Sequence, residues 1–364
     1  MISRSALFRT LSTPVILVLL LVVIAALAKL TGSGPFERTV TETFIRVVLV
    51  VGLYIFIGNS GVMSFGHVGF MCLSAYATAW LTIPPMMKKF SMKGLPDFLL
   101  LHQAPLIVSL VVSPLFAALF AYLVGRILMR LSGIAASIAT FALLAIINVI
   151  YSNWDSVTGG TSSVVGIPML TGIWLSLGGA VIAVMIAYAY GVSRFGLALR
   201  AAREEATAAS ASGVDIVKQR LIAFVVSAFV IGVAGVLYAH FLGVVNPDAF
   251  YLGLTFISLA MLVVGGMNSL SGAVLGVVVI SGIIEILRSL EKGIAIGGAT
   301  VAIPNGLQEI AIGVIMILIL IFRPSGLTRN QELTSRGWPF RREGASKRAL
   351  PPAMPEQEAY GKNH

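Results

Sequence analysis

Charged residues are scarce in this chain of 364 residues. Asp, Glu, Lys and Arg together make up 11% of it, less than half of the roughly 25% that is usual in a soluble domain. Hydrophobic residues make up 57%, which excludes a soluble globular enzyme and a disordered protein. The formal net charge is +10, but in a membrane protein positive residues mark the loops on one side and do not indicate nucleic acid. We therefore expect an integral protein of the lipid bilayer.

Cysteine and histidine are also rare, with one and four copies. The single Cys72 excludes an internal disulfide and a cysteine-based metal cluster, and its place in an apolar run predicts a buried, inert thiol. With so few histidines, we expect no metal site and no catalytic constellation of an embedded enzyme. The sequence also lacks the Gly-x-x-x-x-Gly-Lys-Ser/Thr phosphate-binding loop, so the chain is not expected to hydrolyse ATP.

Ten apolar segments approach the ~20 residues that a transmembrane helix needs. The first follows Arg4 and Arg9 and resembles a secretory signal, but a retained helix is favoured because the remainder of the chain is also apolar. The eighth is short, which leaves open a tilted helix or a re-entrant piece. We predict an all-α polytopic membrane protein with about ten transmembrane helices. The segments are 13–30, 40–57, 62–82, 104–125, 133–151, 172–191, 221–241, 252–266, 272–290 and 306–322.

Lysine and arginine are distributed unevenly between these segments. If the N-terminus is cytoplasmic and the helices alternate, most of the 25 basic residues fall on the cytoplasmic side, although the C-terminal tail increases this difference. The distribution predicts that both termini are cytoplasmic. Residues 1–328 are expected to form the transmembrane domain. Residues 329–364 are basic and proline-containing, which predicts a disordered cytoplasmic tail.

The polar loop 193–220 is rich in alanine and contains no proline. Ala, Leu, Arg and Glu are strong helix formers, and Gly213 is placed to end a helix. The loop therefore predicts a short amphipathic helix on the cytoplasmic side. It could lie on lipid, but a face of mixed charge suits a protein partner better than anionic lipid. The charged residues of this face are Arg200, Arg203, Glu204 and Glu205.

Two pairs of ionisable residues lie inside predicted helices, where charges are costly and often functional. Glu42 and Arg46 are four residues apart, and Glu285 and Arg288 are three apart, so each pair can form along one helix face. Two interpretations stay open: each pair neutralises itself near the outer surface, or the pairs line a polar path. The helices contain no chain of Asp, Glu and His that could relay protons, which argues against an ion-coupled secondary transporter.

Two clusters of glycine, at 58–70 and 265–272, each follow one apolar segment and precede another. Both contain Gly-x-x-Ser, which begins at Gly61 in the first cluster and at Gly266 in the second. This repetition suggests two structurally related halves, as in many transporters. The alternative is that small residues simply let helices pack closely.

Several separated motifs, spread over residues 45–327, resemble the permease subunits of branched-chain amino acid ABC importers. Their number and order make the resemblance far more specific than any one motif alone. The motifs are Gly-x-x-Ser-Phe-Gly-His at 61–67, Asn-Trp-Asp-Ser-Val-Thr-Gly-Gly at 153–160 with Gly-Ile-Pro at 166–168, Phe-Gly-Leu-Ala-Leu-Arg-Ala-Ala-Arg-Glu-Glu at 195–205, Ala-Gly-Val-Leu-Tyr-Ala-His at 234–240, Val-Gly-Gly-Met-Asn-Ser-Leu-Ser-Gly at 264–272 and Phe-Arg-Pro-Ser-Gly-Leu at 322–327.

This resemblance implies an ABC importer permease fold that forms the translocation path for branched-chain amino acids in a bacterial inner membrane. It implies a second, related permease, two cytoplasmic ATPase subunits and a periplasmic substrate-binding protein as partners. ATP is then used by a separate subunit, and this chain needs no cofactor. Close relatives carry urea, short-chain amides or aromatic acids, so these substrates remain alternatives, with the ion-coupled transporter less favoured.

The resemblance also assigns roles to residues. Loop 194–213 corresponds to the coupling helix that docks on the ATPase, although Ala206 stands where many relatives have Glu. Independently of the resemblance, we take the polar residues of the glycine clusters as candidates for the translocation path, and we expect loop 152–168 to face outward, toward the binding protein. The coupling residues are Arg200, Arg203, Glu204, Glu205, Ala208, Ala209 and Gly213. The path candidates are Ser64, Gly66, His67, Asn268 and Ser269.

Overall fold

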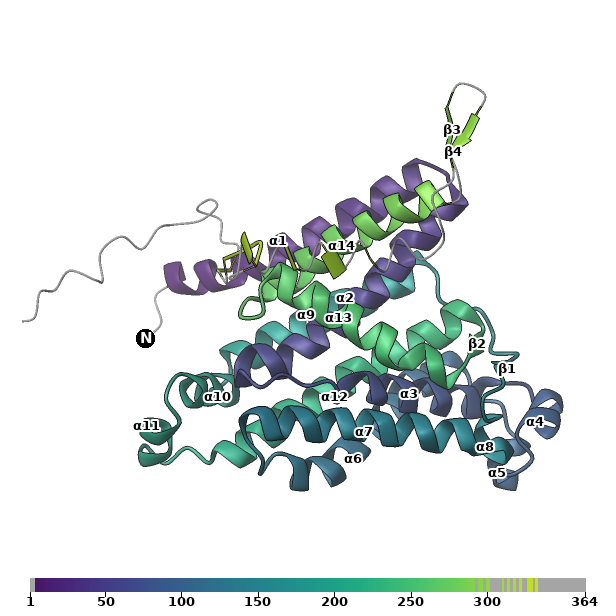
Figure 1. Ribbon diagram of the computed structural model, residues 1–364, viewed down its shortest axis with the longest axis horizontal. Helices are drawn as coiled ribbons and strands as arrows, with labels where there is room; N and C mark the ends of the chain where they lie inside the picture. Colours follow the sequence, from purple (N-terminus) through teal and green to yellow (C-terminus); the bar gives the residue numbers. More distant parts are fainter. Residues whose placement is uncertain are drawn as a thin grey trace, which may run out of the picture.

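Helices make up nearly all of the secondary structure in the computed structural model (Figure 1). The structure describes residues 4–291, 294–296, 299–301 and short stretches between 310 and 332. Within these residues, eight helices are long and apolar enough to cross a membrane, so the chain is a polytopic helical membrane protein, as predicted. They are α1 (Arg4–Leu30), α2 (Gly34–Ser60), α6 (Leu106–Leu128), α7 (Gly133–Asn153), α9 (Ile173–Val192), α12 (Ile216–Leu242), α13 (Leu252–Gly265) with the preceding 3-10 turn η1 (Pro247–Phe250), and α14 (Leu270–Glu291).

Two of the ten predicted segments are not among these eight helices. The segment 62–82 forms α3 (His67–Thr82), whose 16 residues are fewer than the ~20 of a full crossing. The segment 306–322 and the tail 329–364 lie mostly outside the described residues, so the count of ten and the disorder of the tail stay predictions. The short segment 252–266 forms α13, which runs on from η1 as one candidate crossing.

The short elements gather at the two ends of the helix bundle (Figure 1). One end carries α10 and α11 and is named the α10–α11 end. The other carries α4, α5, α8 and the antiparallel strands β1 and β2 and is named the β1–β2 end. A second hairpin, β3 with β4, follows α14. The bounds are α4 (Pro85–Ser91), α5 (Asp97–Leu100), α8 (Asp155–Thr158), α10 (Arg194–Glu204), α11 (Ala206–Ala211), β1 (Val164–Val165), β2 (Val244–Val245), β3 (Ile294–Ile296) and β4 (Ala299–Val301).

Helix α2 lies at the centre of the bundle. Nearly every residue from Val40 to Ser60 is buried, and the helix packs against α12, α9 and α14. Gly52 permits the approach of α12, because a Cβ at this position would lie 2.5 Å from Cγ1 of Ile231. The Ser227 hydroxyl of α12 donates a hydrogen bond to the Gly52 carbonyl at 2.7 Å. Small residues thus set the separation of the two central helices.

The outward faces of α6 and α7 are strongly apolar. In water such a surface would mark an interaction site or an aggregation hazard, whereas in a bilayer it is the ordinary boundary with lipid. Cys72 is buried in α3, as predicted. Exposed large side chains of α6 and α7 include Leu115, Leu119, Leu123, Ile127, Ile134, Ile138, Ile146 and Val149.

Helices α13 and α14 form a hairpin whose backbones nearly touch. A Cβ at Gly276 of α14 would lie 2.0 Å from the Met261 carbonyl oxygen of α13, and a Cβ at Gly265 would lie 1.9 Å from the Gly272 carbonyl oxygen. Gly266 ends α13 with a φ of 120°, which residues with a side chain rarely adopt. The second glycine cluster therefore combines a turn with close packing of the helices on either side.

Candidate functional site

The polar loop 193–220 folds into two short helices, α10 and α11, where the sequence predicts one. The Ser193 hydroxyl caps α10 by accepting a hydrogen bond from the Gly196 N–H at 3.3 Å. Glu205 separates the helices: its backbone is extended, and its carboxylate caps α11 by accepting a backbone N–H at 3.2 Å. Gly213 follows in the left-handed conformation, with a φ of 84°, which agrees with its predicted role as a helix end.

Arg203, at the end of α10, connects this helix to both glycine clusters. Its Nη1 donates to the Gly58 carbonyl at 2.6 Å and to the Asn268 side-chain oxygen at 3.1 Å. Its stem packs on Gly61, where a Cβ would lie 2.7 Å from the arginine Cγ. The clusters also touch each other, because a Cβ at Gly58 would lie 2.7 Å from the Met267 carbonyl oxygen. The two turns that share the Gly-x-x-Ser pattern therefore meet at one guanidinium.

Described residues of the C-terminal region pack against the second glycine cluster. The Leu327 N–H donates to the Val264 carbonyl at 2.8 Å. The Glu332 carboxylate accepts the N–H groups of Leu270 and Ser271 at 2.7 and 3.0 Å, which places a negative charge at the start of α14, where the helix dipole favours it. Sequence reasoning missed this cap, because Glu332 follows the last apolar segment and lies in the predicted tail.

Three of the five path candidates are buried in the interior of the protein. Ser64 and His67 are buried and joined by a contact of 2.6 Å between the hydroxyl and Nδ1. The imidazole packs between the rings of Phe56 and Phe224, with centroids 5.1 and 5.0 Å away. Gly66 is buried as well, and a Cβ there would lie 2.6 Å from a carbonyl oxygen of α7. This group holds α3 against α2 and α12.

The other two path candidates belong to the turn between α13 and α14. Asn268 is exposed and accepts from Arg203. Ser269 is buried, and its hydroxyl lies 2.8 Å from that of Thr328. The structure therefore places the five candidates in two neighbouring segments, one at the start of α3 and one between α13 and α14. Contact of any of them with substrate stays a prediction.

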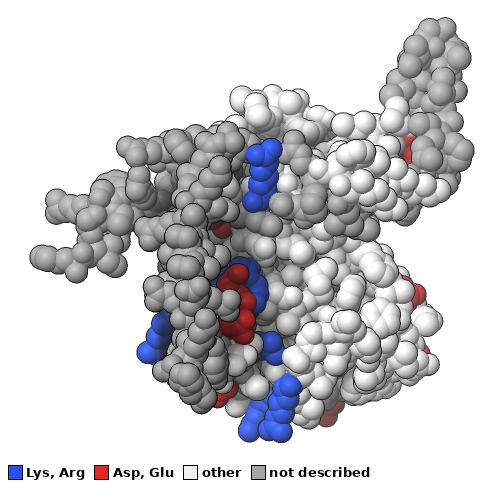
Figure 2. Space-filling view, turned by 60° about the vertical axis from the view of Figure 1, so that its left-hand side comes forward, with Lys and Arg blue, Asp and Glu red and all other residues white. Residues whose placement is uncertain are grey.

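The residues predicted to couple to an ATPase differ in their exposure. Ala209 packs against its own chain, at 6% exposed, and the Arg200 guanidinium donates to the Gly191 carbonyl. In Figure 2, which turns the α10–α11 end forward, charged side chains gather on that side and most of the remaining described surface is uncharged. The α10–α11 end therefore presents a group of charged side chains on this face of the molecule. The exposed coupling residues are Glu204, Glu205, Ala208 and Gly213.

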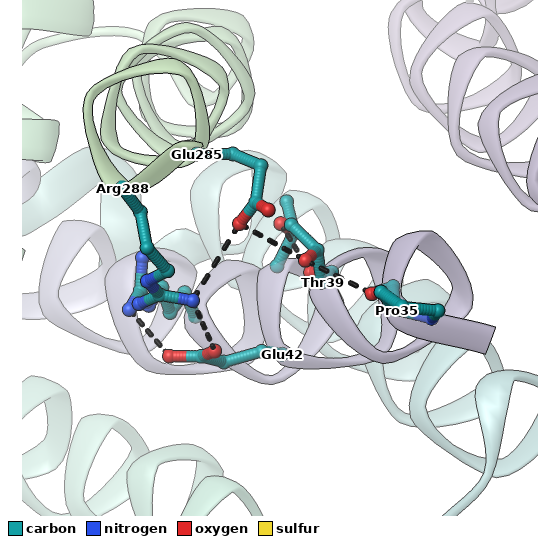
Figure 3. A network of polar contacts seen from close by, with 7 residues as sticks. Pro35, Thr39, Glu42, Glu285 and Arg288 are labelled. Atoms are coloured by element: carbon teal, nitrogen blue, oxygen red, sulfur yellow. Dashed lines mark hydrogen bonds and ion pairs between the residues drawn. The ribbon is translucent and has the colours of Figure 1, made fainter. Parts of the chain in front are cut away.

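The two charged pairs inside helices form as their spacing predicts, and they also join each other (Figure 3). Glu42 pairs with Arg46 along α2. Nη1 of Arg288 on α14 lies 3.5 Å from the Glu285 carboxylate and 3.9 Å from that of Glu42. The Thr39 hydroxyl donates to Glu285 at 3.0 Å. The network links α2 to α14, and its two acidic and two basic groups sum to zero charge.

Loop 152–168 lies at the β1–β2 end, opposite α10 and α11 (Figure 1). Strand β1 pairs with β2 in the register Val164 with Val245. The Trp80 indole N–H donates to the Val157 carbonyl at 3.0 Å. Both contacts join segments that are distant in the sequence, so the loop has a defined shape.

Lys88 closes the neighbouring loop at the same end. Its side chain is fully buried, and its ammonium donates to the carbonyls of Leu99 and His102, each at 2.8 Å. Burial lowers the pKa of Lys88 to about 8. The lysine therefore acts as a clip that joins α4 to the end of α5.

Replacing this clip is expected to loosen the loop. Lys88→Met keeps the length of the side chain but removes both hydrogen bonds, so we expect hydrogen exchange over residues 85–103 to accelerate about tenfold, or roughly 1.4 kcal/mol. Lys89→Met, at the exposed neighbouring position, is the control and should leave exchange unchanged. Equal protection in the two variants would contradict the clip.

The pH dependence of the loop follows from the same lysine. Its pKa in the folded chain is below the ordinary value of 10.5, so between about pH 8 and 10.5 the unfolded loop binds more protons. The folded loop should therefore gain stability as pH rises through this window. Limited proteolysis of the unchanged protein and of Lys88→Met at about pH 7 and about pH 10 measures the difference, which only the unchanged protein should show.

Residues 36–320 match the family model described as branched-chain amino acid transport system / permease component. The chain is 25% identical over 352 residues to the high-affinity branched-chain amino acid transport system permease protein LivM of Salmonella typhimurium, which covers 87% of this chain and 75% of that protein. The match to LivM of Escherichia coli has the same extent.

A second kind of permease also matches. The high-affinity branched-chain amino acid transport system permease protein LivH of Escherichia coli is 30% identical over 162 residues, which is 44% of this chain and 47% of that protein. No solved structure matches significantly. The match to these two LivM proteins therefore covers most of this chain, whereas the match to LivH covers less than half of it.

Proposed function

Because this chain belongs to the family of branched-chain amino acid transport permeases, we propose that it forms, with a second permease subunit, the translocation path of an ATP-driven importer. It is the permease component of such an ABC system and not an enzyme. The observation that carries the proposed mechanism is the contact of one guanidinium, that of Arg203, with two glycine turns and the exposed α10–α11 segment. A movement of α10 would be transmitted to both turns through Arg203.

The α10–α11 segment is the proposed docking site for a cytoplasmic ATPase subunit. It offers the small side chain of Ala208 beside exposed acidic residues, Glu204 and Glu205. Small residues let a helix sit deep in a groove, and the charges fix its register. Two ATPase subunits would engage two permeases in this way.

The orientation in the membrane follows from this assignment. The α10–α11 end and both termini would be cytoplasmic, in line with the excess of Lys and Arg predicted for that side. The β1–β2 end, with loop 152–168, would then face the periplasm of a bacterial inner membrane and receive the substrate-binding protein. The Lys88 clip would stabilise the surface that this protein meets.

The second permease subunit is proposed to be a related chain. Relatives of both the LivM and the LivH kind match this sequence, which favours a heterodimer of two similar permeases. The recurrence of Gly-x-x-Ser at Gly61 and Gly266, in turns that touch, supports two related halves within the chain. An importer permease fold with about ten helices accommodates both features.

A bulky residue at the docking surface tests the proposal. Ala208→Trp should prevent the ATPase from associating, since the ring cannot enter a groove shaped for alanine, and uptake of leucine should fall at least about tenfold. Co-purification of the ATPase with the tagged permease, and ATP-dependent uptake in cells, are the measurements. Ala208 is preferred to Ala209, because a large residue at the buried Ala209 would disturb the chain itself.

Ala135→Trp is the matched control. Ala135 is exposed in the first turn of α7, where a large side chain meets no proposed ATPase groove. Loss of co-purification with Ala208→Trp alone supports docking at α10–α11. Normal recovery of the ATPase with Ala208→Trp, or uptake that persists without ATP and collapses with the ion gradient, would refute the proposed mechanism.

A further inference from the structure

A small cavity lies next to the charged network, between α2, α3, α12 and α13. Its volume is about 40 Å³, enough for water but not for an amino acid. Glu42 and Arg46 line one side. The remaining wall is aliphatic apart from one phenol, and consists of Ile45, Leu49, Met71, Leu254 and Tyr238. One carboxylate, one guanidinium and an apolar wall are therefore brought together in one site.

The two charges are mostly withdrawn from the surroundings. The side chains of Arg46 and Glu42 are 17% and 22% exposed. Charges in such a setting are expensive unless paired, and here pairing is exact in number, because Glu285 and Arg288 complete a neutral group of four. Arg288 lies within 3.9 Å of Glu42, so Glu42 keeps a cationic partner even when Arg46 turns to another group.

We propose that this cavity is a binding site for a zwitterionic α-amino acid with an aliphatic side chain, a step on the translocation path that rests on the proposed transport function. The substrate carboxylate faces Arg46, its ammonium faces Glu42, and its side chain lies on the aliphatic wall. One internal ion pair is exchanged for two with the substrate. No net charge enters the site, so no charge is left unpaired.

The balance of charges in the site also determines which ligands it accepts. A 2-oxo acid brings a carboxylate without an ammonium, and an alkylamine brings an ammonium without a carboxylate. Either ligand would leave the group of charges with one negative or one positive charge in excess, which is strongly unfavourable in a site of low dielectric constant. The site accepts a zwitterion and rejects the corresponding anion or cation.

The proposed site is too small for an amino acid in this structure. Its walls come from four helices, and three of them, α3, α12 and α13, face the two charges of α2 across it. Admission of an amino acid requires these walls to separate from α2. Alternating access provides such a movement, because it opens the path on one side and then on the other.

The double variant Glu42→Gln/Arg46→Gln tests the site. It removes both charges together, keeps the shape of the side chain at position 42, shortens the one at position 46 and leaves a neutral pair in place of the ion pair. In proteoliposomes containing the whole importer, with ATP and binding protein supplied, we expect the maximal rate of leucine uptake to fall at least tenfold. The half-saturating concentration of loaded binding protein should not change, since that protein docks elsewhere.

The control is Lys29→Gln/Glu37→Gln. This pair joins α1 to the start of α2 at 2.5 Å and is more exposed, so its removal deletes the same kinds of charge outside the cavity. Uptake should stay within twofold of the unchanged importer. Normal uptake with Glu42→Gln/Arg46→Gln, or an equal loss in both double variants, would overturn the proposal.

A second measurement uses the unchanged protein and does not depend on a variant that folds. Photo-leucine, a diazirine analogue of leucine, is loaded through the binding protein, irradiated during turnover, and the labelled peptides are identified. Label on the α2, α3, α12 or α13 residues of the cavity supports the site, and label confined to other segments overturns it. If the unchanged importer shows no ATP-dependent leucine uptake, the transport function itself fails, whereas uptake without label at the cavity refutes the site alone.

Discussion

Gly276→Leu is expected to prevent α13 and α14 from forming their hairpin. Any Cβ at this position would lie 2.0 Å from the Met261 carbonyl oxygen and 2.8 Å from the Gly265 Cα. Both are backbone atoms, so no side-chain rotation relieves the clash and the helices must separate. We expect a loss of more than about 3 kcal/mol of folding free energy, seen as a large fall in monodisperse yield and in melting temperature in mild detergent.

Gly282→Leu on the same helix is the matched control. Nothing lies within 4 Å of a Cβ built at this glycine, and the position is exposed. The two variants have the same helix propensity change and the same added volume, so a difference between them isolates the contact with α13. Similar yield and melting temperature for both would show that α13 and α14 do not pack this closely.

The sequence predicts part of this hairpin. The glycine cluster 265–272 identifies the turn, and close packing of the flanking helices is one of its two interpretations. Gly276, however, lies in the middle of an apolar helix. The residues around it do not show whether another helix packs closely against this glycine. Which glycines are indispensable depends on the neighbouring helix, and Gly282 on the same helix faces open space.

Local signals also predicted helix in the polar loop 193–220. Helix propensity and Gly213 were enough to predict a helix within loop 193–220, whereas the break at Glu205 was not, because it depends on one extended residue that caps α11. The partners of Arg203 are 145 and 65 residues away in the sequence. Spacing along a chain carries no information on contacts of that kind.

For the charged residues, too, the sequence predicts contacts within a helix but not contacts between helices. Spacing of three and four residues predicts the pairs within α2 and within α14, and both are present. The contact of Arg288 with Glu42, and the cavity beside it, depend on how the two helices cross. For Ser64 and His67 the sequence suggests a polar path near a glycine turn, but it cannot show that Phe224 of α12 packs on the imidazole.

Arg203→Met is expected to uncouple ATP hydrolysis from transport. Methionine keeps much of the stem that packs on Gly61 but removes the donors to Gly58 and Asn268, at 2.6 and 3.1 Å. Charge-assisted hydrogen bonds contribute about 1.5–3 kcal/mol each, so α10 would lose its firm connection to both turns. Methionine also removes the ion pair between Arg203 and the exposed Glu204 carboxylate at 2.6 Å, but Glu204, Glu205 and Ala208 themselves remain. The ATPase should therefore still bind, while leucine uptake falls at least about tenfold at undiminished ATP hydrolysis.

Arg194→Met separates this effect from the simple loss of a positive charge in α10. Arg194 is exposed, and its guanidinium lies over the Phe195 ring, 4.8 Å from the centroid, away from the glycine turns. This variant should keep the ratio of leucine transported to ATP hydrolysed. If Arg203→Met keeps that ratio as well, motion of α10 reaches the membrane helices by a route other than the guanidinium. If it instead loses the ATPase, then Arg203 acts in docking, and the link between the two turns serves only to hold the coupling helix in place.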